Sequence, residues 1–266
     1  MKKLKFITTI EARMTSTRLP GKVLKRFKSN NPKYDNLTCL KILIDRIRES
    51  KYISDIIIAT SVNSTDDEIE IFCKENKIDC FRGSEIDVLG RLAEAVKSTN
   101  KDHVIQLTGD NPFIDPRVID YVVRAYIDEY PRLDYVTNNG LMQLQHHEIP
   151  LGMDVSVFAV QKLINNSLLA KEEAFREHPG LYFYKNNSNM YNVLNVPIPN
   201  QWKRRDKNIR LTFDTEEDFQ FLQTLYDYFS KTSNKFSLEE ILIYLDKNIY
   251  LLEINANTPQ KIPIIK

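Results

Sequence analysis

The sequence predicts an α/β fold with one doubly wound, mostly parallel sheet. Short apolar runs rich in β-branched residues recur along the chain, and such runs are typical of strands buried on both faces of a parallel sheet. Segments with apolar residues at helical spacing lie between them. Because the two patterns alternate as β–α–β–α, helical crossovers join the strands, which makes neighbouring strands parallel.

The individual elements follow from the same two patterns. We expect strands at 6–10, 56–59, 79–82, 104–107 and 211–213. We expect helices at 40–47, 65–73, 88–96, 118–130, 217–229 and 238–245. The capping-box pattern Thr65-Asp-Asp-Glu68 opens the second helix, and Asp115-Pro116 supplies an N-cap and a first helical residue for the fourth.

The alternation of strands and helices weakens in one region. Pro and Gly become frequent between 135 and 200, although an apolar run lies at 155–160. We therefore expect an inserted arm or small subdomain there, with a long surface excursion as the alternative. Residues 1–254 are expected to form a single domain, and 255–266 a peripheral C-terminal tail.

Composition excludes several classes of protein. The 266 residues carry a formal net charge of +1, so no overall field favours nucleic acid or a membrane surface, and we expect neither as a partner. Cys39, Cys73 and Cys80 form no CxxC pair, which argues against a zinc site or a disulfide framework and suits a reducing, cytoplasmic setting. No apolar run approaches the ~18 residues of a transmembrane helix. The start, MKKLKFITTI, fits a first strand better than a signal peptide.

A basic loop follows the first expected strand. The stretch IEARMTSTRLPGKVL, residues 10–24, holds Arg13, Arg18 and Lys22 around one Pro-Gly. It lies at the carboxyl end of a strand, where open α/β sheets bind ligands. Backbone N–H groups, two guanidinium forks and one ammonium would form a phosphate cradle there. The spacing matches neither a Walker loop nor GxGxxG, and a solvated basic loop stays open as the alternative.

Two carboxylates follow later strands at the same edge of the sheet. Asp110 ends the run VIQLTGD, and Asp214 ends the run IRLTFD. A carboxylate beside a polyphosphate needs a cation between them, and Mg²⁺ prefers oxygen ligands that it shares with phosphates. The alternatives are a turn aspartate at Asp110 and a helix cap at Asp214 or Thr215. The basic loop and the two carboxylates together favour a nucleotide site with a metal.

Several motifs resemble those of the cytidylyltransferase family, in the same order along the chain. They are ARMTSTRLPGKVL, GDNPFIDP, PLGMDVSVF, REH and RLTFDTEEDF. The resemblance covers roughly residues 5 to 228. It extends to 3-deoxy-manno-octulosonate and acylneuraminate cytidylyltransferases, and it is greatest to the spore-coat polysaccharide branch. It implies a Rossmann-like nucleotidyltransferase fold, Mg²⁺ dependence, and transfer of CMP from CTP to a sugar or sugar acid with release of pyrophosphate, for surface polysaccharide or glycan synthesis.

The resemblance also implies roles for individual residues. The implied catalytic residues are Arg13, Lys22, Asp110 and Asp214, the last two as metal ligands. The implied nucleotide-binding residues are Ala12, Arg13, Ser16, Arg18, Lys22, Ser84 and Arg91. The implied substrate-binding residues are Asp154, Arg176 and His178, and the region 135–200 would bind the acceptor and pair two subunits as a homodimer.

The chain departs from the family pattern at a few positions. Glu11 stands where the spore-coat branch usually has Gln, and Gly90 where it usually has Asp. Pro179-Gly180 follows REH in place of Val-Thr-Pro, and the DTEED turn has no Pro. These changes leave the nucleotide and the acceptor open. A metal-dependent nucleotide-sugar glycosyltransferase and a non-catalytic nucleotide-binding module remain as alternative functions.

Overall fold

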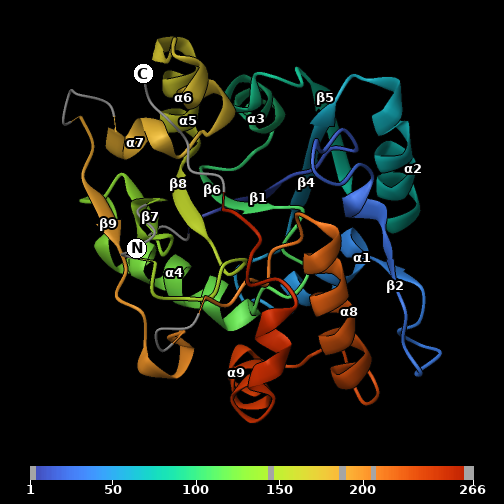
Figure 1. The fold of residues 1–266 in the computed structure, drawn as a ribbon. Coiled ribbons are helices and arrows are strands. Elements are labelled where there is room, and N and C mark those ends of the chain that lie inside the picture. The colour runs from blue at the N-terminus through green and yellow to red at the C-terminus, as the bar shows by residue number, and fades with distance from the viewer. Residues whose placement is uncertain (1–3, 143–146, 186–189, 205–207, 261–266) are drawn as a thin grey trace.

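The fold is organised around one seven-stranded sheet with the order β5-β4-β1-β6-β8-β7-β9 (Figure 1). The computed structural model describes residues 4–142, 147–185, 190–204 and 208–260. The strands of the sheet are β1 (Phe6–Glu11), β4 (Ile56–Ser61), β5 (Asp79–Gly83), β6 (His103–Thr108), β7 (Tyr135–Thr137), β8 (Ser156–Ala159) and β9 (Val193–Asn195). A separate antiparallel pair is formed by β2 (Arg26–Phe27) and β3 (Leu37–Thr38).

Parallel pairing dominates the first half of the sheet, as predicted. β1 lies between β4 and β6 and is parallel to both, and β5 is parallel to β4. Every residue of β4 is buried, which explains why this strand reads as a continuous apolar run. The exception is β8, which is antiparallel to both β6 and β7. The sheet is therefore mixed but mostly parallel, and the predicted α/β class is confirmed.

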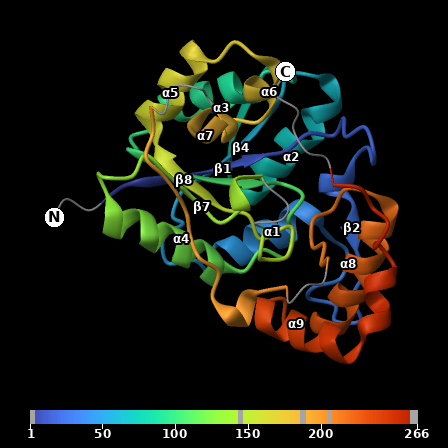
Figure 2. The same cartoon turned by 60° about the vertical axis from the view of Figure 1, so that its left-hand side comes forward.

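Helices cover both faces of the sheet (Figure 2). The α-helices are α1 (Cys39–Ile47), α2 (Asp67–Asn76), α3 (Val88–Lys97), α4 (Pro116–Glu129), α5 (Val160–Leu169), α6 (Glu173–Glu177), α7 (Leu181–Lys185), α8 (Glu216–Phe229) and α9 (Leu238–Lys247). Short 3-10 helices are η1 (Lys22–Leu24), η2 (Ser64–Asp66), η3 (Gly140–Met142), η5 (Asn200–Trp202) and η6 (Ile249–Glu253). One apolar core joins α3, α5, α6 and α7 to one face, and a larger core joins the other face to α1, α2, α4, α8 and α9.

The region 135–200 belongs to the sheet, which corrects the expected arm or subdomain. It supplies β7, β8 and β9, and α5, α6 and α7 pack on the sheet beside α3. Val155 and Val157 are buried in the larger core. Val155 and Val157 of this apolar run therefore pack inside their own chain.

Two local expectations are wrong, and both concern residues near the candidate functional site described below. Residues 211–213 form no strand, because the only pairing there is an isolated bridge between Leu151 and Arg210. Helix α2 begins at Asp67 without a side-chain cap, since the carboxylate of Asp66 binds other groups. The expected cap at Asp115 is confirmed, because its side chain accepts a hydrogen bond from the Arg117 backbone N–H.

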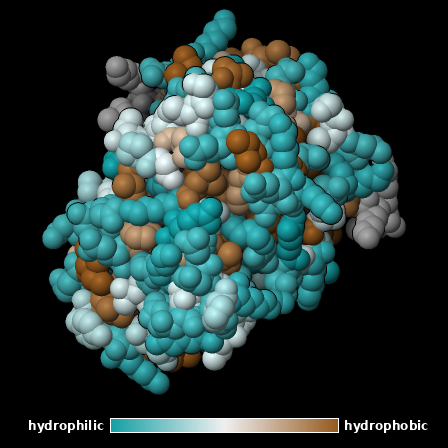
Figure 3. All heavy atoms as spheres, turned by 90° about the vertical axis from the view of Figure 1, so that its right-hand side faces the viewer, coloured by the Kyte–Doolittle hydropathy of each residue, from teal (hydrophilic) through white to brown (hydrophobic). Residues whose placement is uncertain are grey.

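The surface is mostly polar. Figure 3 shows the face that carries α2 and α8, where apolar side chains lie in small separate groups among hydrophilic ones. Single exposed apolar residues, such as Ile71 on α2, are normal on a folded surface. Among the helices that the structure describes, none has the length and apolar character needed to cross a membrane.

Candidate functional site

The basic loop leaves the carboxyl end of β1 and folds back on itself. The Gly21 N–H donates to the Met14 carbonyl at 2.8 Å, which closes the loop. Gly21 has φ +74°, a left-handed conformation that favours glycine. The buried carboxylate of Asp66 accepts from the Met14 N–H at 2.7 Å and from the hydroxyls of Thr60 and Ser61. Asp66 thus fixes the loop to the end of β4. The sequence did not predict this role, because Asp66 lies inside the expected capping box at 65–68.

The loop delivers Lys22 to the two predicted carboxylates. Lys22 Nζ lies 2.6 Å from Asp110 Oδ2 and 2.8 Å from Asp214 Oδ1, and the residue is only 7% exposed. Burial alone would lower the pKa of Lys22, but the charges of Asp110 and Asp214 raise it above its ordinary value. Burial likewise opposes ionisation of Asp110, yet the Lys22 ammonium holds the pKa of that carboxyl below its usual range. Three residues far apart in the sequence therefore form one compact charge cluster.

Asp214 is the more heavily paired of the two carboxylates. Besides Lys22, it contacts Arg18 Nη2 at 2.8 Å and Arg210 Nη2 at 3.2 Å. Arg210 is buried and also binds Asp218, whose carboxylate caps the start of α8 together with Thr215. The sequence did not reveal Arg210 or Asp218, although RLTFD places an arginine four residues before the carboxylate. Thr215 is the N-cap, so the side chain of Asp214 is free to serve the cluster.

Close backbone contacts bring the two carboxylates together. A Cβ at Gly109 would lie 2.9 Å from the Glu11 carbonyl oxygen, so only glycine lets β6 end so near β1. The Phe213 N–H then donates to the Asp110 carbonyl at 2.8 Å. Gly152, with φ +97°, allows the neighbouring segment to lie against Leu211, whose carbonyl carbon would be 2.6 Å from an added Cβ. Glycine is thus required on steric grounds in both the GD and the PLGMD motifs.

The C-terminal segment contacts this cluster. After η6 the chain returns toward the carboxyl edge of the sheet (Figure 1). Arg18 Nη1 donates to the Pro259 carbonyl at 3.2 Å, and Arg210 Nη1 donates to Gln260 Oε1 at 2.6 Å. Asn255 is buried and donates to the Arg210 carbonyl. Residues 255–260, which the sequence analysis placed in a peripheral tail, therefore support the arginines of the site, whereas 261–266 lie outside the described residues.

The expected nucleotide-binding residues line the β1–β4–β5 side. Arg13 Nη1 lies 3.6 Å from Glu85 Oε1, and Glu85 also accepts from the Thr15 hydroxyl and from Asn63 Nδ2. Arg91 is buried on α3 and donates to the carbonyl oxygens of Ser84 and Glu85. Ala12 and Ser16 belong to the same loop, Ala12 buried and Ser16 half-buried. Glu85 joins the loop to this side, and the sequence analysis missed it.

The expected acceptor residues do not come together in one place. Asp154 precedes β8, and its Oδ1 lies 2.7 Å from Nε2 of the buried His147. Burial alone would lower the pKa of His147, but Asp154 raises it. Arg176 on α6 pairs with Asp87, the N-cap of α3. The structure thus ties Arg176 to α3, not to Asp154. His178 follows α6 and lies 3.9 Å from the Glu177 carboxylate.

Glu11, one of the departures from the family pattern, adds a carboxyl group within electrostatic reach of Arg91 and Asp110. It ends β1, and Gln106 Nε2 on β6 donates to its Oε1 at 2.7 Å. Burial raises the pKa of Glu11 to about 7, although Gln106 and Arg91 partly offset this effect. Glu11 therefore titrates near neutral pH.

The site can accept a divalent cation on chemical grounds. Asp110 and Asp214 converge on one ammonium, so both could contact one cation if Lys22 moved toward a bound phosphate. Among the residues that the structure describes, no group of three or more His, Cys, Asp and Glu is placed to hold a metal. Two carboxylates suit Mg²⁺, because it usually retains waters and shares phosphate oxygens with a substrate.

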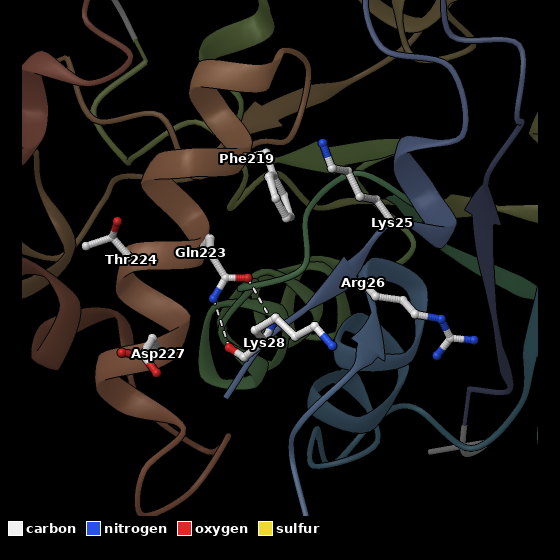
Figure 4. A pocket seen from close by; sticks show the side chains of 7 residues that line it. All are labelled: Lys25, Arg26, Lys28, Phe219, Gln223, Thr224 and Asp227. Carbon is white, nitrogen blue, oxygen red and sulfur yellow. Dashed lines mark hydrogen bonds between the residues drawn. The ribbon is translucent and has the colours of Figure 1, made fainter. Parts of the chain in front are cut away.

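A pocket of about 660 Å³ lies between β2 and α8 (Figure 4). Its lining residues are Lys25, Arg26, Lys28, Phe219, Gln223, Thr224 and Asp227. Gln223 bonds both the backbone N–H and the carbonyl of Lys28, each at 2.8 Å, and Lys25 Nζ lies 4.1 Å from the centre of the Phe219 ring. These contacts hold β2 against α8, so the residues that line the pocket have a structural role.

Comparison with known proteins agrees with this architecture. The family described as Cytidylyltransferase matches residues 7–251. The chain is 34% identical over 244 residues to the spore coat polysaccharide biosynthesis protein SpsF of Bacillus subtilis strain 168, covering 90% of this chain and 93% of SpsF.

Two solved structures share the fold. A cytidylyltransferase from Leptospira borgpetersenii serovar Hardjo-bovis strain JB197 has a TM-score of 0.83 at 29% identity, over 97% of this chain and 100% of that one. A CMP:2-keto-3-deoxy-manno-octonic acid synthetase complexed with CTP has a TM-score of 0.57 at 16% identity, over 83% of this chain and 98% of that one. The family match covers nearly the whole chain, and the chain belongs to the cytidylyltransferase family.

Proposed function

We propose that the protein transfers CMP from CTP to a hydroxyl group of a sugar or sugar acid, with release of pyrophosphate. The observation that carries this proposal is Lys22 held between Asp110 and Asp214 at 2.6 and 2.8 Å, beside a loop that also bears Arg13 and Arg18. Such a cluster offers cations to phosphates and carboxylates to a metal. Membership of the family and the CTP complex of a structural relative support cytidine as the base.

The basic loop would bind the triphosphate. Arg13 and Arg18 offer planar forks to phosphate oxygens, and Lys22 offers a compact charge. Arg18 and Lys22 are paired with carboxylates in this structure, so they would exchange these partners for phosphate oxygens when CTP binds. Their charges would then stabilise the pyrophosphate as it leaves.

Asp110 and Asp214 would hold Mg²⁺, which when bound polarises the α-phosphate and neutralises its charge. The acceptor oxygen forms a bond to the α-phosphorus, and the bond from that phosphorus to the β-phosphate oxygen breaks. The acceptor hydroxyl loses its proton to solvent as the new bond forms, so the products are the CMP-linked acceptor, pyrophosphate and one proton. The protein supplies position and charge and needs no covalent nucleophile, as in phosphoryl transfer.

The proposal is tested by pyrophosphate release from each of the four nucleoside triphosphates with panels of sugars, sugar acids and sugar phosphates. We expect release with CTP, dependent on both a divalent cation and an acceptor. Turnover of a nucleotide sugar without consumption of triphosphate would favour a glycosyltransferase instead. Binding of CTP without turnover of any acceptor would favour a non-catalytic module.

A further inference from the structure

One buried carboxylate binds both the basic loop and the end of a central strand. Asp66 is 0% exposed, and its Oδ1 accepts from the Met14 backbone N–H at 2.7 Å. Its Oδ2 accepts from the Thr60 hydroxyl at 2.9 Å and from the Ser61 N–H at 3.0 Å. The Ser61 hydroxyl is a further donor to Oδ2. One oxygen of Asp66 therefore holds the loop, and the other holds the end of β4.

This arrangement requires a carboxylate rather than an amide at position 66. Two of the donors are the backbone N–H groups of Met14 and Ser61, which bond different oxygens and cannot act as acceptors. An asparagine has one side-chain oxygen, so it could satisfy only one of these N–H groups. Burial opposes ionisation of Asp66, but the hydrogen bonds from Ser61, Met14 and Thr60 hold its pKa below the ordinary value. Asp66 is therefore ionised at neutral pH and accepts all four bonds.

Met14 is the fixed point of the basic loop. Its N–H bonds Asp66, and its carbonyl accepts from the Gly21 N–H at 2.8 Å. Lys22 follows Gly21 directly, and its Nζ lies 2.6 Å from Asp110 Oδ2. Two hydrogen bonds through Met14 therefore connect Asp66 to the segment that places Lys22 in the charge cluster.

The buried Asp66 can act on a ligand only through this loop. The loop carries Arg13 directly before Met14, and Arg18 and Lys22 after it. A loop that is already held in its binding conformation loses less conformational entropy when a ligand binds, so its affinity is higher. The advantage applies to phosphates that the loop contacts and not to the rest of the nucleotide.

We propose that Asp66 is a positioning residue for the triphosphate: it holds the basic loop in the conformation that binds the β- and γ-phosphates of CTP, and it does not touch the nucleotide. This inference rests on the proposed binding of CTP by the basic loop. It predicts that loss of the bond between Asp66 and Met14 weakens binding of CTP much more than binding of CMP, because CMP lacks the phosphates that the loop would hold.

The test is binding of CTP and of CMP, each with Mg²⁺, by wild type, Asp66→Asn and Asp115→Asn. CTP binding is measured by calorimetry, and CMP binding by saturation-transfer NMR, which also detects weak binding. Asp115 is the matched control, because it is buried and accepts a backbone N–H on each oxygen, from Arg117 and from Leu238. Its bonds serve the starts of α4 and α9 instead of the basic loop. Both variants should lose stability, so thermal unfolding is recorded for each.

We expect Asp66→Asn to bind CTP roughly tenfold more weakly than wild type, which is the order of one hydrogen bond to a charged group. Its CMP affinity should change little, and Asp115→Asn should bind both ligands as wild type does. Equal losses for CTP and CMP in Asp66→Asn would overturn the inference, as would equal losses of CTP affinity in the two variants. Failure of wild type to bind CTP would overturn the proposed function as well.

Hydrogen exchange of the Met14 amide in wild type provides a second measurement that needs no variant, and it decides if Asp66→Asn does not fold. The inference predicts that this amide exchanges slowly before any nucleotide is added, because Asp66 already holds it. An amide that becomes protected only after CTP and Mg²⁺ are added would show that the loop is not held in advance, and would overturn the inference.

Discussion

Replacing Lys22 by Met tests whether the charge cluster is a preformed metal and phosphate site. The ammonium lies within hydrogen-bonding distance of Asp110 and Asp214 at 2.6 and 2.8 Å and is almost fully buried. Removing one partner of a buried ion pair costs about 3–5 kcal/mol, because the remaining charge is uncompensated. Asp214 keeps Arg18 and Arg210, so the loss falls mainly on Asp110 and should lie near the lower bound.

The assay is thermal unfolding of Lys22→Met and wild type, with EDTA and with millimolar Mg²⁺. A loss of about 3 kcal/mol should lower Tm by about 6–12 °C in EDTA, given roughly 2–4 °C per kcal/mol for a chain of this size. Mg²⁺ should restore more stability to the variant than to wild type, because it binds the two freed carboxylates only in the folded state.

A surface lysine provides the matched control. Lys97 is exposed and pairs with Glu94 at 3.3 Å, so Lys97→Met should change stability by less than about 1 kcal/mol. The reasoning is refuted if Lys22→Met is no more destabilising than Lys97→Met in EDTA. It is also refuted if Mg²⁺ stabilises Lys22→Met no more than wild type.

Further predictions concern activity and pH. Asp110→Asn and Asp214→Asn should each lower kcat on the order of 10²-fold or more while circular dichroism stays unchanged, and near-normal rates in both would exclude a two-carboxylate metal site. Burial raises the pKa of Glu11 to about 7, so folding favours the protonated carboxyl. The protonated side chain therefore contributes to the stability of the fold at low pH, and this contribution is lost as the pH rises through 7. Glu11→Gln should therefore raise Tm relative to wild type at pH 8 and not at pH 4, and a difference independent of pH would contradict this. His178→Ala should change the KM or kcat for the acceptor with CTP affinity intact; unchanged acceptor kinetics would leave His178 with a structural role only.

The sequence predicted the parallel strands β1, β4, β5 and β6, and it singled out the two carboxylates that the structure brings together, because each has a local signal. The apolar run of β4 and the GD motif after β6 are readable without long-range information. Asp66 was missed because its partner Met14 is distant in the chain and because its position resembled a helix start. Arg210 was missed although Asp214 follows it by four residues, because the sequence does not show that the side chain is buried against that carboxylate. β8 was interpreted as part of an arm. Its apolar sequence does not show whether a strand pairs parallel or antiparallel, or which strand it lies beside.

The most direct test of the account is release of pyrophosphate from CTP by wild type and by Asp110→Asn, with Mg²⁺ and a panel of neutral and acidic saccharides. The account predicts release by wild type that needs CTP, Mg²⁺ and an acceptor together, and its loss on the order of 10²-fold in the variant. Release that persists in Asp110→Asn, or wild type that binds CTP but releases no pyrophosphate with any saccharide, neutral or acidic, would contradict it.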